Sequence, residues 1–262
     1  MRWHIDLASE IGGRAEQQDR ACAFDVPRRP HDCLVVLADG MGGREHGGLA
    51  AQAVLDAAEN ALAERPVDNP TQFLTGLCEQ AHAAILDIGR QRHTRPGSTC
   101  VCLYLTGDEA YWAYVGDSRL YHFTADTLLS QTRDHTVGEL LKDNPGDTRP
   151  DGVEGAHDHH LYTCLGGQGE LQPEFGATAI GADDWFMLCS DGFWNQVDAD
   201  EVAQRIPACH QEQGNAADLV AIATRRGGMH SDNTSLVLVT RKTSLLGKAW
   251  RRARMPGRLF GA

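Results

Sequence analysis

The stretch Cys33-Leu-Val-Val-Leu-Ala-Asp39-Gly40 gives the first indication of the fold. Its first six residues form an unbroken apolar run, which is typical of a short strand that is buried on both faces. Asp39-Gly40 then ends the run with residue types that favour a turn. The stretch therefore predicts a buried strand that delivers a carboxylate to a loop at its end.

Aspartates border other predicted strands in the same way. One follows the apolar strand at 185–189, another precedes the strand at 234–239, and two more lie in short polar segments. The ends of strands are exposed parts of a rigid scaffold, where side chains from distant segments can converge. A single Asp-Gly pair is most simply a turn. For the whole set, the residues alone do not decide whether the aspartates only form turns or together form a functional site. The set is Asp19, Asp39, Asp117, Asp191 and Asp232.

The chemistry of this set favours hard divalent cations. Mg²⁺ and Mn²⁺ prefer carboxylate, carbonyl and water ligands, whereas zinc sites use His and Cys, and no CxxC motif is present. Two such ions about 4 Å apart activate a water molecule and bind a phosphoryl oxygen. Glycine after a ligand, as at Gly40, lets the backbone approach an ion closely. The set is therefore a candidate two-metal site.

The remaining pattern predicts an α+β fold. Strands follow one another in hairpin-like series while helices come in pairs, which favours antiparallel sheets flanked by helices over a doubly wound parallel sheet. We expect strands at 3–11, 98–105, 110–115, 120–123, 128–130, 175–180, 185–189 and 234–239, and helices at 48–63, 71–89, 137–141, 199–206 and 216–225.

Composition narrows the class of protein. The 262 residues suit one large domain, which we place at 1–240 with a basic tail at 241–262. A net charge of −12 argues against nucleic acid as a partner, and so against a two-metal nuclease. No segment resembles a secretory signal or is long enough to span a membrane, so we expect a cytoplasmic monomer with reduced cysteines. The tail is either a solvated segment or a docking element for an acidic surface.

Eight strings, in order along the chain, resemble the metal-dependent Ser/Thr protein phosphatases of the PP2C-like family, especially the compact bacterial members. They cover nearly the whole chain up to about residue 240, and it is the ordered set that makes the resemblance specific. The strings are Arg14-Ala-Glu-Gln-Gln-Asp19, Ala38-Asp-Gly-Met-Gly-Gly43, Gly97-Ser-Thr99, Tyr114-Val-Gly-Asp-Ser-Arg119, Asp134-His-Thr136, Leu161-Tyr-Thr-Cys-Leu-Gly-Gly167, Leu188-Cys-Ser-Asp-Gly192 and Ser231-Asp-Asn-Thr234.

The resemblance implies a fold of two stacked antiparallel sheets flanked by helix pairs, with a flap at about 136–160. It also implies two Mn²⁺ or Mg²⁺ ions, with Asp39 bridging them and the Gly40 carbonyl binding one. A metal-bridged water would attack phosphorus, and Arg14, Asp39 and Asp191 would carry catalysis. The resemblance also implies that Arg14 binds the substrate phosphate, that Asp191 and Asp232 bind the first metal ion, and that Asp19 serves the second. Asp117 would help to bind a weaker third ion.

The implied function is hydrolysis of phosphoserine and phosphothreonine in proteins that a partner Ser/Thr kinase has modified. Where some family members have histidine after Asp-Gly, this chain has Met41, so the residue that protonates the leaving group is unassigned. Two other functions stay open at this point. One is a pseudophosphatase that binds phosphoproteins without hydrolysis, and the other is a metal-binding regulatory domain.

Overall fold

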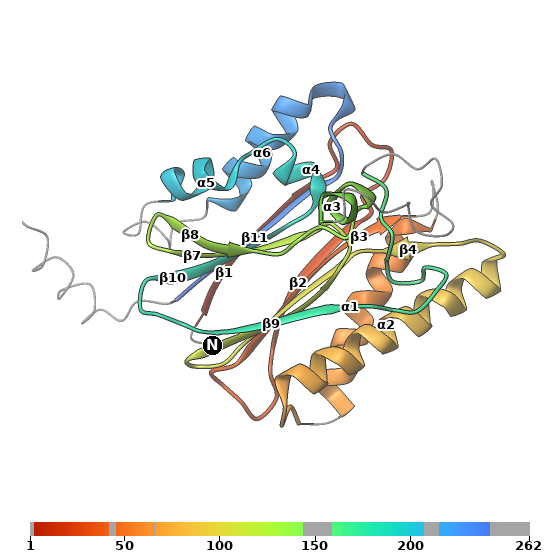
Figure 1. Ribbon diagram of the computed structural model, residues 1–262, viewed down its shortest axis with the longest axis horizontal. Helices are drawn as coiled ribbons and strands as arrows, with labels where there is room; N and C mark the ends of the chain where they lie inside the picture. The colour runs from red at the N-terminus through yellow and green to blue at the C-terminus, as the bar shows by residue number, and fades with distance from the viewer. Residues whose placement is uncertain (1–2, 42–45, 65, 144–158, 207–214, 242–262) are drawn as a thin grey trace, which may run out of the picture.

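The computed structural model describes residues 3–41, 46–64, 66–143, 159–206 and 215–241, and they form a sandwich of two antiparallel sheets (Figure 1). The first sheet has the order β1 (Trp3–Glu10), β11 (Thr234–Arg241), β10 (Asp184–Cys189), β7 (Arg119–Thr124) and β8 (Thr127–Gln131). The second has the order β2 (Asp19–Asp25), β3 (Cys33–Met41), β5 (Cys100–Leu105), β6 (Glu109–Val115) and β9 (Glu174–Ala179), with β4 (Gly97–Ser98) paired to β3.

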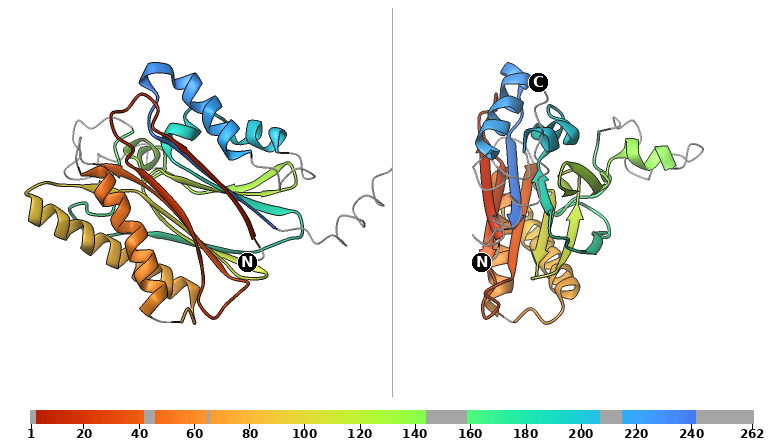
Figure 2. Two further views of the ribbon diagram at one scale, coloured as in Figure 1. Left: turned by 180° about the vertical axis from the view of Figure 1, so that it is seen from behind. Right: turned by 90° about the vertical axis from the view of Figure 1, so that its left-hand side faces the viewer.

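Helices cover the outer face of each sheet (Figure 2). Residues of α1 (Gly47–Glu64) and α2 (Pro70–Arg92) share a buried cluster with the second sheet. The one-turn α4 (Asp191–Trp194), α5 (Ala199–Arg205) and α6 (Ala216–Gly227) share another with the first. The short α3 (Val137–Asp143) and the 3-10 turn η1 (Gly228–His230) complete the described elements.

The alternation of side chains explains why the run at 33–38 is apolar throughout. Successive residues of a strand point to opposite faces. Val35 and Leu37 therefore pack between the two sheets, while Leu34 and Val36 pack under the helices. Because both faces of β3 are covered, no position in this part of the strand faces water.

Capping residues fix the ends of α2. The Asn69 side chain accepts a hydrogen bond from the Gln72 N–H at 3.1 Å, and Pro70 is the first helical residue. At the other end His93 adopts a left-handed conformation with φ of 55°. The helix thus extends beyond both ends of the predicted 71–89.

The predicted fold class is confirmed, and so are most of the predicted strands and helices, with shifted ends. Two details were wrong. The strand predicted at 98–105 is divided at Thr99 into β4 and β5, and Asp39-Gly40, predicted as a turn, continue β3 because they pair with β2 and β4. The strand β2 was not predicted, because the apolar run in Asp-Arg-Ala-Cys-Ala-Phe-Asp is only four residues long, two of them alanine, and most of its side chains are only half-buried. Residues 144–158 of the predicted flap lie outside the described residues. Arg241, the first residue of the predicted tail, is the last residue of β11, and the rest of the tail also lies outside the described residues. No helix in the described part of the chain is long and apolar enough to cross a bilayer.

Candidate metal centre

Strand pairing brings the predicted aspartates to one edge of the sandwich. In the antiparallel register of β2 and β3, Asp19 lies directly opposite Asp39. In the other sheet, β10 ends two residues before Asp191, and its antiparallel neighbour β11 begins two residues after Asp232. Asp117 lies in the turn between β6 and β7. Four of the five predicted carboxylates therefore lie at or next to strand ends of the two facing sheets, and the fifth lies in a turn that joins these sheets.

Asp19 is tied to the opposite sheet by Ser190. The Ser190 hydroxyl donates to Asp19 Oδ2 at 2.7 Å and accepts the Ser235 N–H at 3.0 Å. The other oxygen, Asp19 Oδ1, is buried with no hydrogen-bond partner in the described part of the protein. Burial raises the pKa of Asp19 to about 6, against the lowering effect of the Ser190 hydroxyl.

The neighbouring carboxylates are perturbed in the same direction. Burial, and then the charges of Asp19 and Asp191, raise the pKa of Asp39 well above its usual range. Burial, and then the charge of Asp117, raise the pKa of Asp191 to about 7, and Asp191 Oδ1 is also buried without a partner among the described residues. The pKa of Asp117 is raised to about 6 by burial and then by Asp134. Simultaneous ionisation of these buried acids is therefore costly, and a nearby cation would reduce that cost.

Gly40 lies where α1 begins. A Cβ at this position would lie 1.9 Å from the Gly47 backbone oxygen, which no real side chain tolerates. The reciprocal Cβ on Gly47 would lie 2.5 Å from the Gly40 oxygen. Two glycines facing each other therefore let the start of α1 pack directly on the end of β3, next to Asp39.

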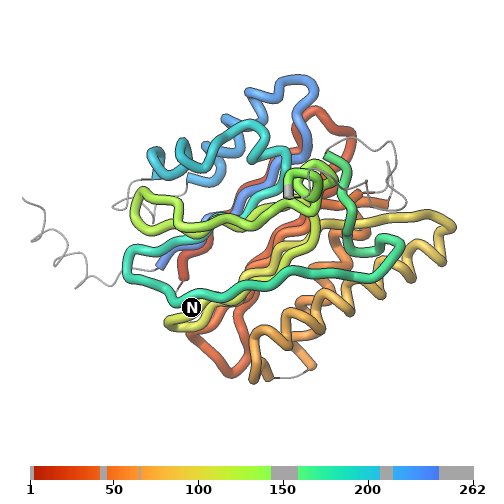
Figure 3. The backbone as a smooth tube through the Cα atoms, viewed as in Figure 1, coloured from red at the N-terminus to blue at the C-terminus, as the bar shows by residue number. Residues whose placement is uncertain are grey.

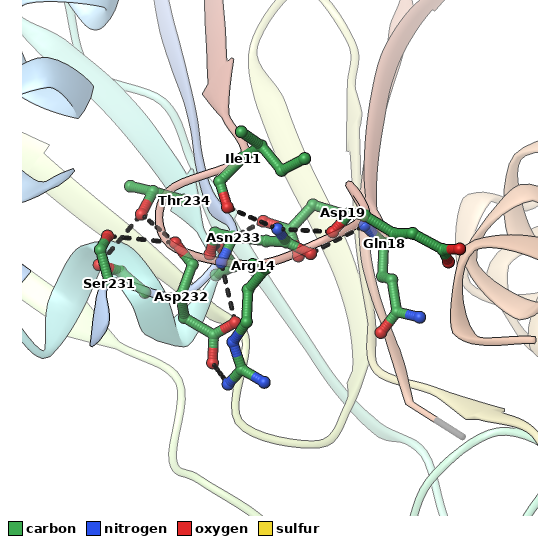
Figure 4. A network of polar contacts seen from close by, with 11 residues as sticks. Ile11, Arg14, Gln18, Asp19, Ser231, Asp232, Asn233 and Thr234 are labelled. Atoms are coloured by element: carbon green, nitrogen blue, oxygen red, sulfur yellow. Dashed lines mark hydrogen bonds and ion pairs between the residues drawn. The ribbon is translucent and has the colours of Figure 1, made fainter. Parts of the chain in front are cut away.

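Asn233 links the loop that carries Arg14 to the start of β11 (Figure 4). Its side-chain amide donates to the backbone oxygens of Ile11 and Glu16 at 2.9 and 3.0 Å. Its side-chain oxygen accepts the Gln18 N–H at 2.8 Å, next to Asp19. Sequence reasoning gave Asn233 no role, although it lies inside the quoted string 231–234.

Arg14 forms an ion pair with Asp232, and its side chain is 57% exposed. Figure 4 shows the two side chains meeting each other. The loop that carries Arg14 is held by the Gly13 N–H, which donates to the Ser231 oxygen at 2.9 Å. The guanidinium is therefore placed beside one of the predicted carboxylates and remains open to solvent.

Two further quoted strings supply groups that position the aspartates. The Asp39 N–H donates to Thr99 Oγ1 at 2.9 Å, and Thr99 in turn is hydrogen-bonded to the Ser118 hydroxyl at 2.7 Å. Trp194 Nε1 donates to the Asp117 backbone oxygen at 2.8 Å. The centre of the same indole lies 3.6 Å from the Arg119 guanidinium carbon. These contacts fix the backbones of Asp39 and Asp117, and sequence reasoning missed them.

The donor set fits hard divalent cations. Acidic oxygens converge, two of them are buried without a partner in the described structure, and the carboxylates raise one another's pKa. Within the described residues, no three His, Cys, Asp or Glu side chains stand in a ready-made cage. Asp232 is turned to Arg14, and Asp19 Oδ2 accepts the Ser190 hydroxyl, whereas Asp19 Oδ1 and Asp191 Oδ1 have no partner among the described residues. The backbone thus assembles the ligand set, and two buried carboxylate oxygens remain available to an ion.

Comparison with known proteins places these observations in a family. A family model described as protein phosphatase 2C matches residues 9–221. The chain is 27% identical over 243 residues to the protein phosphatase PhpP of Streptococcus pneumoniae, covering 90% of this chain and 96% of the relative.

Solved structures give the same result. The fold is similar to the Ser/Thr phosphatase PstP/Ppp of Mycobacterium tuberculosis, with a TM-score of 0.76, 25% identity, and 92% and 99% of the two chains covered. It is also similar to the catalytic domain of the Ser/Thr phosphatase PstP in complex with two manganese ions. That comparison has a TM-score of 0.70, 26% identity, and 90% and 97% coverage.

Proposed function

This chain belongs to the protein phosphatase 2C family, and from that premise we propose that it removes phosphate from phosphoserine and phosphothreonine of other proteins. The observation that carries the proposal is the convergence of Asp19, Asp39 and Asp191 at one edge of the sandwich, with an open arginine on the adjoining loop. Relatives that are named as Ser/Thr phosphatases favour catalysis over a silent phosphoprotein-binding role.

We propose that the centre holds two divalent cations, either Mn²⁺ or Mg²⁺. Asp39 would contact both and the Gly40 carbonyl one of them, Asp191 and Asp232 would complete one site, and Asp19 would serve the other. Asp117, whose backbone oxygen is held by Trp194, would take part in a weaker third site. When bound, the cations supply Lewis-acid activation of the water nucleophile and neutralise charge on the phosphoryl oxygens.

The residues of the chain perform the remaining tasks. Arg14 has the planar fork that suits two phosphate oxygens, and we propose that it exchanges Asp232 for the substrate phosphate. The Thr99 hydroxyl accepts the Asp39 N–H and so holds that residue at the end of β3. Positioning of this kind matters because phosphoryl transfer depends on alignment and charge stabilisation.

The biological setting follows as a set of predictions. We propose a one-domain enzyme at 1–240 that acts as a cytoplasmic monomer and reverses the action of a Ser/Thr kinase. The basic tail predicted at 241–262 stays a prediction, either as a solvated segment or as a docking element, except that Arg241 ends β11.

The decisive experiment is hydrolysis of a phosphothreonine peptide by the purified chain with Mn²⁺, with Mg²⁺ and with EDTA. We expect activity only with metal, and a loss of at least about 100-fold in Asp39→Asn and Asp191→Asn. Asp126→Asn is the matched control, because it removes one exposed carboxylate away from the site. Absence of hydrolysis by a protein that demonstrably binds Mn²⁺ would refute the proposal and favour phosphoprotein binding.

A further inference from the structure

A cleft of about 660 Å³ adjoins the end of β3, just beyond Asp39. Its lining comes from the end of α2 and the segment that follows it, at 89–97, and from the loop at 164–168. Figure 3 shows the course of these backbone segments. Met41, two residues after Asp39, lines the same cleft. The cleft therefore opens from the strand that carries the predicted bridging carboxylate.

Hydrogen bonds join the two sides of the cleft to each other and, through Ser98, to that strand. Ser98 and Leu165 exchange two backbone hydrogen bonds at 3.0 and 2.9 Å, and the Ser98 hydroxyl donates to the Asp39 backbone oxygen at 3.1 Å. The Gly166 N–H donates to His82 Nδ1 on α2 at 3.1 Å, which ties the loop to the helix. The cleft is thus a formed feature with a fixed relation to the metal centre.

The lining of the cleft is basic and apolar, whereas the protein as a whole is acidic. Arg90, His93 and Arg95 are its charged or titratable residues, together with the Cys164 thiol, and no acidic residue lines it within the described chain. Arg90 pairs with Asp87, whereas the Arg95 side chain is exposed. The net charge of the chain is −12, but this cleft has an exposed arginine and no acid in its described lining. The charge of the cleft is therefore opposite in sign to that of the protein as a whole.

The apolar part of the lining suits an extended peptide. Leu86, Pro96 and Met41 line the cleft together with the basic groups. A Cβ on Gly97 would lie 3.1 Å from Cys164 Sγ and 3.3 Å from the Leu165 oxygen, so glycine lets the two sides of the cleft lie close together here. Small, apolar and basic groups in a formed cleft match a polypeptide that carries acidic side chains.

We propose that this cleft binds the segment of the phosphoprotein substrate that flanks the phosphorylated residue, and that it selects acidic residues in that segment. The inference rests on the proposed phosphatase function and adds a substrate class to it. Arg95 is the main selecting residue, and Arg90 assists. Met41 lies between the cleft and the edge of the sandwich that carries the candidate metal centre.

The test uses two phosphothreonine peptides that differ only in flanking residues, with Glu in one and Lys in the other, placed on either side of the phosphothreonine. We expect the wild type to prefer the Glu peptide in kcat/KM. Arg95→Glu lowers the Glu-to-Lys ratio about 3- to 10-fold, because an exposed attraction becomes a repulsion. Arg92→Glu is the matched control, since Arg92 is exposed at the same helix end but does not line the cleft.

Three results would overturn the proposal. One is a preference of the wild type for the Lys peptide, and another is a ratio that Arg95→Glu leaves unchanged. The third is an equal change in Arg92→Glu, which would mean that only the general charge of the protein matters. Failure of the phosphatase function looks different, because the wild type would then hydrolyse neither peptide nor a small aryl phosphate with Mn²⁺.

Discussion

Replacing Asp191 by asparagine should stabilise the metal-free protein while abolishing its activity. In the folded chain the pKa of Asp191 rises to about 7, first through burial and then through the charge of Asp117. A carboxyl group whose pKa is raised on folding stabilises the fold only at low pH, and its ionisation opposes folding as the pH rises. An asparagine side chain at this position carries no charge at any pH, so the variant escapes this cost.

The magnitude follows from the difference between the two states. Each unit of pKa is worth about 1.4 kcal/mol, so a rise from 3.8 to about 7 costs the wild type up to about 4 kcal/mol at pH 8. Neighbouring carboxylates can take up the proton instead, which lowers the gain from one substitution to about 2 kcal/mol. For a domain of this size that gain corresponds to about 4–8 °C in Tm. At pH 5 most of the cost of ionising Asp191 has disappeared. The stabilisation by Asp191→Asn should therefore be less than half of its value at pH 8.

The assay is thermal unfolding in EDTA from pH 5 to pH 8, followed by far-UV circular dichroism, with Asp126→Asn as the control for loss of one charge. In saturating Mn²⁺ the order should reverse, because only the wild type retains the full ligand set and gains the binding free energy. An Asp191→Asn variant that is less stable than the wild type at pH 8 in EDTA would contradict the electrostatic reasoning. A gain that does not change with pH would contradict it as well.

Three other perturbations follow from contacts in the structure, two at the site and one, Asp184, at the opposite end of β10. Gly40→Ala should cost at least about 2 kcal/mol in urea unfolding, because the new Cβ would lie 1.9 Å from the Gly47 oxygen; unchanged stability would mean that the two backbones separate easily. Arg14→Lys should lower kcat/KM for phosphopeptides by at least about 10-fold, since lysine lacks the planar fork, and an unchanged kcat/KM would exclude two-point phosphate binding. Burial opposes ionisation of Asp184, but the Gly181 N–H at 2.8 Å helps to hold its pKa below the usual value. Asp184→Asn should therefore cost about 1–2 kcal/mol at pH 7 and progressively less as the pH falls below about 4, as measured by denaturant unfolding across that range.

The sequence predicted most of the fold because its strands and helices carry strong periodic signals. The run at 33–38 is apolar throughout, since both of its faces are covered. The strand β2 escaped prediction because it alternates weakly and both begins and ends with aspartate. Its existence depends on pairing with β3, which is a tertiary contact rather than a local preference.

The site was predictable as a set of residues but not as an arrangement. Aspartates at strand ends indicated a hard-metal site, and the resemblance supplied their expected roles. The position of Asp19 opposite Asp39 depends on strand register, which the residues alone do not specify. The bond between Gln18 and Asn233 joins segments 215 residues apart, so no local pattern reveals it. The ion pair of Arg14 with Asp232 depends on the same long-range closure.

The register of β2 against β3 also limits how this sequence can change over evolutionary time. The ladder runs from the Asp19–Asp39 pair to the Asp25–Cys33 pair, with residues 26–32 as the connection. One residue inserted within either strand would turn every side chain beyond it to the opposite face and carry one aspartate away from the other. The same insertion at 26–32 would be absorbed by the connection. Among descendants of this sequence, we therefore expect length changes to accumulate in that connection while the two strands keep their length.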